Sequence, residues 1–194
     1  MQILKKLIVF TVFLSVSNSF SQDYFFKDKN PFDSRIPTPE EFLGYSIGDQ
    51  HTRHDQIVSY LYKLAEISDK AEIEIYGYTH EKRKLVILRV SSEKNLADLS
   101  NLKKQHLKFT NPTITPQNYD EVPVFIQLAY NVHGNEPSSS EAALLTAYTL
   151  VASESEEVKN YLNNSVIFID PTINPDGRDR HTQWANQYKA YSLV

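Results

Sequence analysis

The sequence has no cysteine, so the protein gains its stability without disulfide bonds, from a hydrophobic core, a partner or a bound metal. It also lacks a glycine-rich phosphate loop and a cluster of basic residues, which argues against a nuclease or another phosphate-binding enzyme. After the N-terminal residues, no apolar run is long enough to span a membrane. The 194 residues, 41% of them hydrophobic, suffice for one domain with a buried core.

Residues 1–21 have the layout of a secretory signal peptide. Lys5 and Lys6 precede the apolar stretch LIVFTVFLSV, which is too short to cross a bilayer, and the small residues Ser19 and Ser21 follow it. We expect cleavage after about Ser21 and export to the periplasm or the extracellular space, without a transmembrane anchor; a core strand or an N-terminal membrane anchor is the alternative. Loss of two of the 20 basic residues changes the formal net charge from −4 to −6, which argues against a nucleic-acid partner.

The rest of the chain alternates helix patterns with strand patterns. Residues 22–40 contain prolines and no sustained period, which predicts an extended leader into a domain at 41–194. The alternation predicts an α/β fold with a mixed β-sheet flanked by helices, in which the first two strands are antiparallel. Helices are expected at 54–68, 95–109 and 137–153, and strands at 71–78, 84–90, 122–130 and 165–170.

A histidine and a glutamate stand between the third predicted strand and the helix that follows it. His133 and Glu136 are separated by Gly134, which allows a backbone conformation that a side chain would obstruct, and by Asn135. Loops at the carboxyl ends of strands in α/β sheets face a crevice, and zinc binds both imidazole nitrogen and carboxylate oxygen. The pair is therefore a candidate metal site. A glutamate that favours a helix dipole beside a solvated histidine is the alternative, because the pattern is short.

Two segments together resemble the zinc carboxypeptidases of the M14 family. The stretch HGNEPSSSEA is similar to the first metal motif of that family, and INPDG, which follows a later strand, is similar to its Asn-Pro-Asp-Gly turn. The resemblance covers roughly residues 40–194 and implies the front part of a zinc-carboxypeptidase-like three-layer domain. It further implies that His133 and Glu136 are two of three zinc ligands, with one Zn²⁺ per complete domain and a peptide or protein as substrate.

The residues around these motifs receive supporting roles. Arg178 and Arg180 are candidates for binding a substrate carboxylate, since guanidinium groups bind carboxylates in bidentate fashion; a solvated surface position is the alternative for each. Glu141 either forms hydrogen bonds behind the metal ligands or occupies the first turn of a helix. A structural turn under the site is expected at four residues, Asn174, Pro175, Asp176 and Gly177.

Parts of the family's active site have no counterpart in this sequence. The third zinc ligand of the family is a histidine well downstream of the turn, and the general-base glutamate lies later still; His181 comes too soon after the turn to match. The family's Asn-Arg pair for the terminal carboxylate is also missing, because Asn186 is followed by Gln187. We therefore expect an incomplete chain, the front part of a longer enzyme that is inactive alone, with its catalytic residue unknown. A genuine short protein without catalysis is the alternative.

Three functions follow from these patterns. The leading one is an exported zinc-dependent metallocarboxypeptidase, which hydrolyses peptide bonds at the C-terminus of its substrates. A zinc deacylase of the aspartoacylase type has a related fold and a similar HGNE pair, but export and NPDG fit the peptidases better. The third is a non-catalytic exported peptide-binding module that retains His133 and Glu136 as vestiges.

Overall fold

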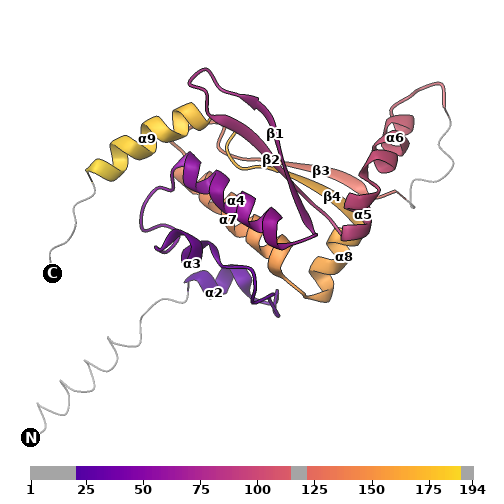
Figure 1. Cartoon of the computed structure of the whole chain (residues 1–194), viewed down its shortest axis with the longest axis horizontal. Helices are drawn as coiled ribbons and strands as arrows, with labels where there is room; N and C mark the ends of the chain where they lie inside the picture. Colours follow the sequence, from indigo (N-terminus) through magenta and orange to yellow (C-terminus); the bar gives the residue numbers. More distant parts are fainter. Residues whose placement is uncertain (1–20, 115–121, 189–194) are drawn as a thin grey trace, which may run out of the picture.

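A computed structural model describes residues 21–114 and 122–188 of the chain. The predicted signal peptide lies outside the described residues except for its last residue, Ser21. The described part is built on one four-stranded sheet with the strand order β1-β2-β4-β3 (Figure 1). Its strands are β1 Ala71–Tyr78, β2 Lys84–Val90, β3 Val124–Ala129 and β4 Ser165–Asp170.

The sheet is mixed, as the sequence predicts. β1 and β2 form an antiparallel hairpin, β2 pairs antiparallel with β4, and β4 pairs parallel with β3. All residues of β4 except Phe168 are buried, which explains its continuous apolar sequence: a central strand needs apolar side chains on both faces. The parallel pair β3 and β4 brings two strand ends, and the loops that follow them, to the same edge of the sheet.

Helices cover the sheet on both faces. α4 and α7 lie side by side against one face (Figure 1), and α4 presents Leu61 and Leu64 to a core that Leu144 of α7 completes; all three are fully buried. No helix in the described ranges 21–114 and 122–188 combines the length and the apolar character needed to cross a membrane. The helices are α2 Ser21–Phe26, α3 Pro39–Leu43, α4 His54–Ile67, α5 Glu93–Ala97, α6 Leu99–Phe109, α7 Pro137–Ala152, α8 Glu156–Asn164 and α9 Pro175–Gln187.

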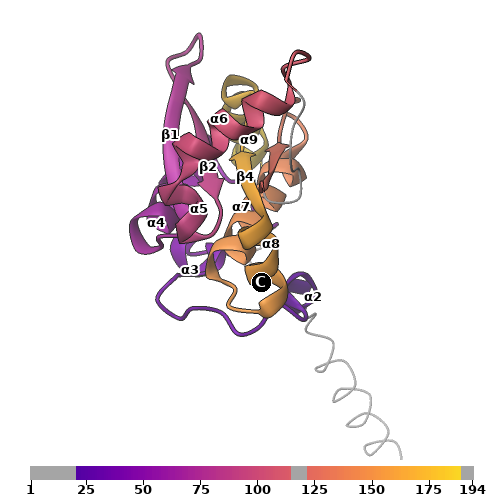
Figure 2. The same cartoon turned by 90° about the vertical axis from the view of Figure 1, so that its right-hand side faces the viewer.

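The opposite face of the sheet is covered in part by α6 (Figure 2). The ring of His106 stacks on Phe125 of β3 with 4.7 Å between centroids, and Phe125 lies 5.5 Å from Phe168 of β4. Phe168 points away from the α4 and α7 side because successive residues of a strand alternate between the two faces. The sheet is therefore the middle of three layers.

The leader at 22–40 is not simply extended. It begins in α2 and then packs on the domain: the rings of Phe26 and Phe32 each lie 5.2 Å from that of Tyr148 in α7. Ile36 is also buried in the core. The prolines of this segment interrupt any helix or strand periodicity of its apolar residues. The sequence therefore does not show which of its apolar side chains are buried.

Two further elements differ from the sequence prediction. The helix predicted at 95–109 is interrupted at Asp98, which ends α5 and precedes the first residue of α6. α8 was not predicted, although Ser155 accepts a hydrogen bond from the Val158 N–H as a helix cap. A serine followed by two glutamates is a helix-start signal, but the helix that follows is short and lies between two longer predicted elements.

Candidate functional site

The loops after β3 and β4 lie against each other and bring the two motifs together. The Tyr130 N–H donates to the Asp170 carbonyl at 2.9 Å, and the Ile173 N–H donates to the Tyr130 carbonyl at 3.0 Å. Beyond these, the Asn174 side-chain amide donates to the Val132 carbonyl at 3.2 Å. Pairing thus continues past the strands, and the segment with His133 lies beside the segment that follows β4.

Gly134 is the point of closest approach between the two motifs. A Cβ atom at this position would lie 2.0 Å from the carbonyl carbon of Gly177 and 2.4 Å from the backbone nitrogen of Arg178. No side chain fits in that space. The sequence correctly indicates that glycine is needed here, and the reason is backbone contact with a distant segment, not a left-handed φ.

Asn131 shapes the loop that carries the candidate metal ligands. Its φ of 56° lies in the left-handed region, which asparagine tolerates better than most residues. The side-chain amide donates to the carbonyls of His133 at 2.8 Å and Glu136 at 3.1 Å, and the Asn131 N–H donates to Ser139 Oγ at 2.7 Å. Asn131 is not among the residues predicted from the sequence, although an asparagine directly after a predicted strand was an available signal.

His133 and Glu136 are close enough to share one metal ion. Their Nδ1 and Oε1 atoms are 3.3 Å apart, and the side chains are 72% and 59% exposed. Two ligands at about 2.0 to 2.2 Å from a tetrahedral zinc lie roughly 3.4 Å apart, so the pair fits two corners of a zinc site. Within the described part of the chain, no group of three or more metal-binding side chains is assembled.

The predicted turn at 174–177 is the first turn of α9. Asn174 is its N-cap, with Oδ1 accepting from the Gly177 N–H at 3.0 Å, and Pro175 begins the helix. Proline suits this position because the first helical N–H groups have no partner within the helix. The Asn-Pro pair was therefore a helix-start signal, whereas the following Asp-Gly pair suggested a turn.

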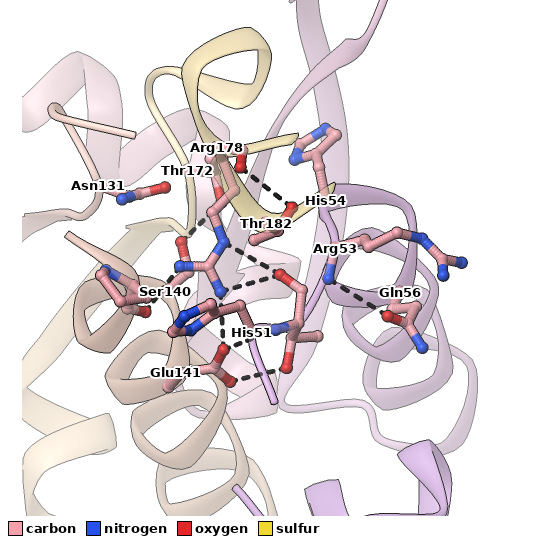
Figure 3. Close-up of polar contacts among 12 residues, drawn as sticks. His51, Arg53, His54, Gln56, Asn131, Ser140, Glu141, Thr172, Arg178 and Thr182 are labelled. Atoms are coloured by element: carbon pink, nitrogen blue, oxygen red, sulfur yellow. Dashed lines mark hydrogen bonds and ion pairs between the residues drawn. The ribbon is translucent and has the colours of Figure 1, made fainter. Parts of the chain in front are cut away.

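Arg178 lies fully buried between three segments (Figure 3). Its Nε and Nη2 donate to the Thr52 carbonyl at 3.0 and 2.9 Å, Nη1 donates to the Pro137 carbonyl at 2.7 Å, and Nη2 also donates to Glu141 Oε1 at 2.7 Å. Burial lowers the pKa of Arg178, and the Glu141 carboxylate opposes that shift. This placement differs from the predicted contact with a substrate carboxylate: the guanidinium holds the start of α7, which directly follows Glu136.

Glu141 is the counterion of Arg178. Its carboxylate accepts hydrogen bonds from the Thr52 N–H and the Thr52 hydroxyl, both at 2.8 Å, in addition to the arginine. Its hydrogen bonds go to Thr52 and Arg178, and none that the structure gives for the described residues joins it to His133 or Glu136. The network connects the start of α7 and the first turns of α9 to the segment before α4.

A second charged network fixes the outer side of α9. Arg83, from the loop between β1 and β2, donates to Asp179 at 2.7 Å and to Asp176 at 2.7 Å. Asp176 also accepts from the Thr79 hydroxyl at 2.7 Å. Partial burial alone would raise the pKa of Asp176, but the hydrogen bonds from Thr79 and Arg83 outweigh it, so the pKa is lowered. The charged loop between β1 and β2 thus fixes the position of α9.

A pocket of about 530 Å³ lies over the contact between the motifs. One wall contains His133, and the opposite wall is the exposed side of α9. The pocket is large enough for part of a small molecule or of a peptide. Its lining residues are His133, Gly134, Asn135, Asn174, Gly177, Arg180, His181 and Trp184.

Asp170, at the end of β4, is a buried carboxyl group near these loops. Its Oδ2 accepts from the Tyr76 hydroxyl at 2.5 Å, and Oδ1 accepts from the Thr172 N–H at 3.3 Å. Burial raises the pKa of Asp170 despite these hydrogen bonds. The folded protein therefore holds this proton more tightly than the unfolded chain does.

We expect Asp170→Asn to reduce the pH dependence of stability above pH 3.8, the ordinary pKa of the group. Because the folded-state pKa is raised, the free energy of unfolding contributed by Asp170 falls as the pH rises from 3.8 through the raised pKa. Urea denaturation at several pH values measures this slope.

Asp33→Asn is the control of opposite sign: hydrogen bonds from Arg35 lower the pKa of Asp33 to about 2, so its stabilisation is lost as the pH falls from 3.8 toward 2. Equal slopes for wild type and Asp170→Asn above pH 3.8 would contradict the expectation.

The described part is thus an α/β protein with a mixed sheet that carries a histidine and a glutamate at zinc-ligand spacing on the loop after a parallel strand. The family model described as zinc carboxypeptidase matches residues 57–191. The chain therefore belongs to the M14 zinc carboxypeptidase family, a family of metallocarboxypeptidases, as its two motifs predict.

Relatives and solved structures agree with this assignment. Carboxypeptidase E of Caenorhabditis elegans is 30% identical over 154 residues, which make up 72% of this chain and 28% of that protein. Thrombin activatable fibrinolysis inhibitor shares the fold with a TM-score of 0.51 and 18% identity, over 82% of this chain and 33% of that chain. Carboxypeptidase A from Helicoverpa armigera shares the fold with a TM-score of 0.51 and 22% identity, over 75% of this chain and 30% of that chain. The chain thus spans about a third or less of the length of these proteins.

Proposed function

We propose that this chain supplies the first two zinc ligands of an exported, zinc-dependent metallocarboxypeptidase. The observation that carries the proposal is the 3.3 Å separation of His133 Nδ1 and Glu136 Oε1, with His133 lining a pocket, in a chain of the zinc carboxypeptidase family. The signal-peptide layout of residues 1–21 supports export. The substrate class that fits is a peptide or protein with a free C-terminus.

Each residue of the site has a part in this function. Zinc, when bound, polarises a carbonyl and lowers the pKa of a bound water to about 7. His133 and Glu136 would hold the ion, and their exposure would leave it accessible to substrate. Asn131 orients the loop through both ligand carbonyls, and Arg178 fixes the backbone directly after Glu136.

The remaining catalytic groups belong to the part of the fold that this chain does not span. A third ligand and a general base are needed to complete a catalytic zinc site, and the described residues assemble no third ligand around the pair. We therefore propose that the 194-residue chain binds metal weakly and does not hydrolyse peptides alone. The complete domain would bind one zinc ion.

We expect His133→Ala and Glu136→Ala each to weaken divalent metal binding by at least about tenfold, because each removes one of two ligands. Titration of the purified chain with Co²⁺, followed by its visible absorption, measures the dissociation constant, and competition with Zn²⁺ extends it to zinc. His80→Ala, which removes an exposed histidine of the hairpin loop, should leave binding unchanged. Unchanged binding in both ligand variants would place the metal elsewhere.

Catalysis is tested in the longer protein. Genomic DNA read past codon 194 should show, in some frame, a histidine and then a glutamate in the order of the family. That protein, once expressed, should contain about one zinc per chain and release C-terminal residues from peptides. Hydrolysis of N-acylated amino acids in place of peptides would favour a deacylase. A stop codon followed by unrelated sequence would remove the catalytic proposal and leave an exported peptide-binding module.

A further inference from the structure

The exposed side of α9 places an arginine and a tryptophan beside the metal pair. Arg180 and Trp184 are four residues apart in the helix, so their side chains share one face. Both line the pocket that His133 lines from the other wall, both are exposed, and 59% of the surface of Trp184 is accessible. His181 lies between them, with its ring centroid 6.1 Å from that of Trp184.

Arg180 differs from the other arginines in having no counterion among the residues that the structure describes. It forms no hydrogen bond or ion pair with any residue that the structure describes, and none of the side chains that line its pocket in those ranges is acidic. Each of the other arginines makes an ion pair with a carboxylate: Arg35, Arg53, Arg83, Arg89 and Arg178. The unpaired guanidinium is therefore available to an anionic group that enters the pocket.

The position of His133 and Glu136 indicates which molecule would carry such an anion. If a peptide lies across His133 and Glu136, its neighbouring residues extend over the opposite wall of the same pocket. A guanidinium binds a carboxylate with two parallel hydrogen bonds, and an exposed indole offers a flat apolar surface for the methylene groups of that side chain. We propose that Arg180 and Trp184 form a subsite that binds an acidic side chain of the peptide substrate, an inference that rests on the proposed function.

The test uses the fluorescence of Trp184, which reports on this pocket directly because it is the only tryptophan of the chain. The full chain is titrated with short alanine-based peptides that carry one glutamate at successive positions near the C-terminus, and with the matching glutamine peptides. At one position the glutamate peptide should bind at least about tenfold more tightly than its glutamine counterpart. Arg180→Gln should abolish that difference without changing the binding of the glutamine peptide.

A matched control separates specific binding from a general effect of charge. Lys104→Gln removes the same charge from an exposed residue of α6, which lies at the opposite end of the molecule from α9 (Figure 1). This variant should retain the full preference for glutamate. A preference that survives Arg180→Gln, or one that Lys104→Gln also removes, would overturn the subsite.

Two further experiments distinguish binding at the subsite from binding at the metal site and from recognition of the peptide's C-terminal carboxylate. The titrations are repeated with and without Zn²⁺, and the glutamate preference should be the same in both, so failure of the proposed zinc site leaves the subsite testable. Amidation of the peptide C-terminus should leave the preference intact. Binding that depends on the free terminal carboxylate and is equal for glutamate and glutamine peptides would overturn the proposal, since Arg180 would then recognise the end of the substrate.

Discussion

Replacing Gly134 by alanine should lower the free energy of unfolding by about 3 kcal/mol or more and abolish metal binding. The added Cβ would lie 2.0 Å from the carbonyl carbon and 2.3 Å from the carbonyl oxygen of Gly177. Backbone atoms cannot rotate aside, so the loops after β3 and β4 must separate. His133 would move with its loop. Chemical denaturation and Co²⁺ titration measure the two effects.

Gly77→Ala is the matched control for this substitution. Among the described residues, a Cβ at Gly77 would meet only Leu85 Cδ1 within 4 Å, at an ordinary contact distance of 3.7 Å. Both substitutions restrict the unfolded chain equally, because each replaces glycine by alanine, so the difference between them reports on the native clash. If the two variants were equally stable, backbone contact between the motifs would not be what Gly134 provides.

Replacing Arg178 by methionine should lower the free energy of unfolding by about 3 to 5 kcal/mol, because it leaves the Glu141 carboxylate buried without its counterion. Arg178 has no exposed surface and the Glu141 side chain is 9% exposed, so water cannot take the place of the guanidinium. The double variant Arg178→Met with Glu141→Met should recover part of the loss, since a buried apolar pair carries no unpaired charge. Chemical denaturation of the single and double variants measures this coupling.

The control for the buried pair is an exposed one. Lys63→Gln breaks the ion pair with Glu66 on α4, where the side chains are 37% and 69% exposed, and should cost less than about 1 kcal/mol. Arg178→Met should also weaken metal binding, because the guanidinium holds the Pro137 carbonyl next to Glu136. A loss for Arg178→Met as small as that for Lys63→Gln would contradict the role of the network.

The sheet and its long helices were predictable because their signals are local, and so was the closeness of the His133 and Glu136 side chains. An alternating strand such as 71–78 and a helix stripe such as 54–68 show in neighbouring residues which face is buried. The HGNE segment combines a strand end, a glycine and two metal-binding side chains within a few positions. Parallel pairing of β3 and β4 then follows from the fold class.

The environment of Arg178 was not predictable in the same way. Its partners Glu141 and Thr52 lie 37 and 126 positions away, and nothing near Arg178 in sequence distinguishes it from Arg180, two residues later. A helix turns about 100° per residue, so these two arginines point in different directions once α9 forms. One is enclosed and paired, and the other faces the pocket. Only the position of the helix in the fold decides which is which.

The strand order also determines when the site can form. β4 is the last strand of the described sequence but lies between β2 and β3, so the hairpin of β1 and β2 has no contact with β3 until β4 enters. Long-range strand pairing of this kind is slow and leaves apolar surface exposed while it is incomplete. During synthesis, the segment with His133 emerges well before the residues that hold it. A nascent chain therefore carries His133 and Glu136 before the segment that follows β4 is present to pack against their loop, and the sheet is joined only when its central strand β4 is added.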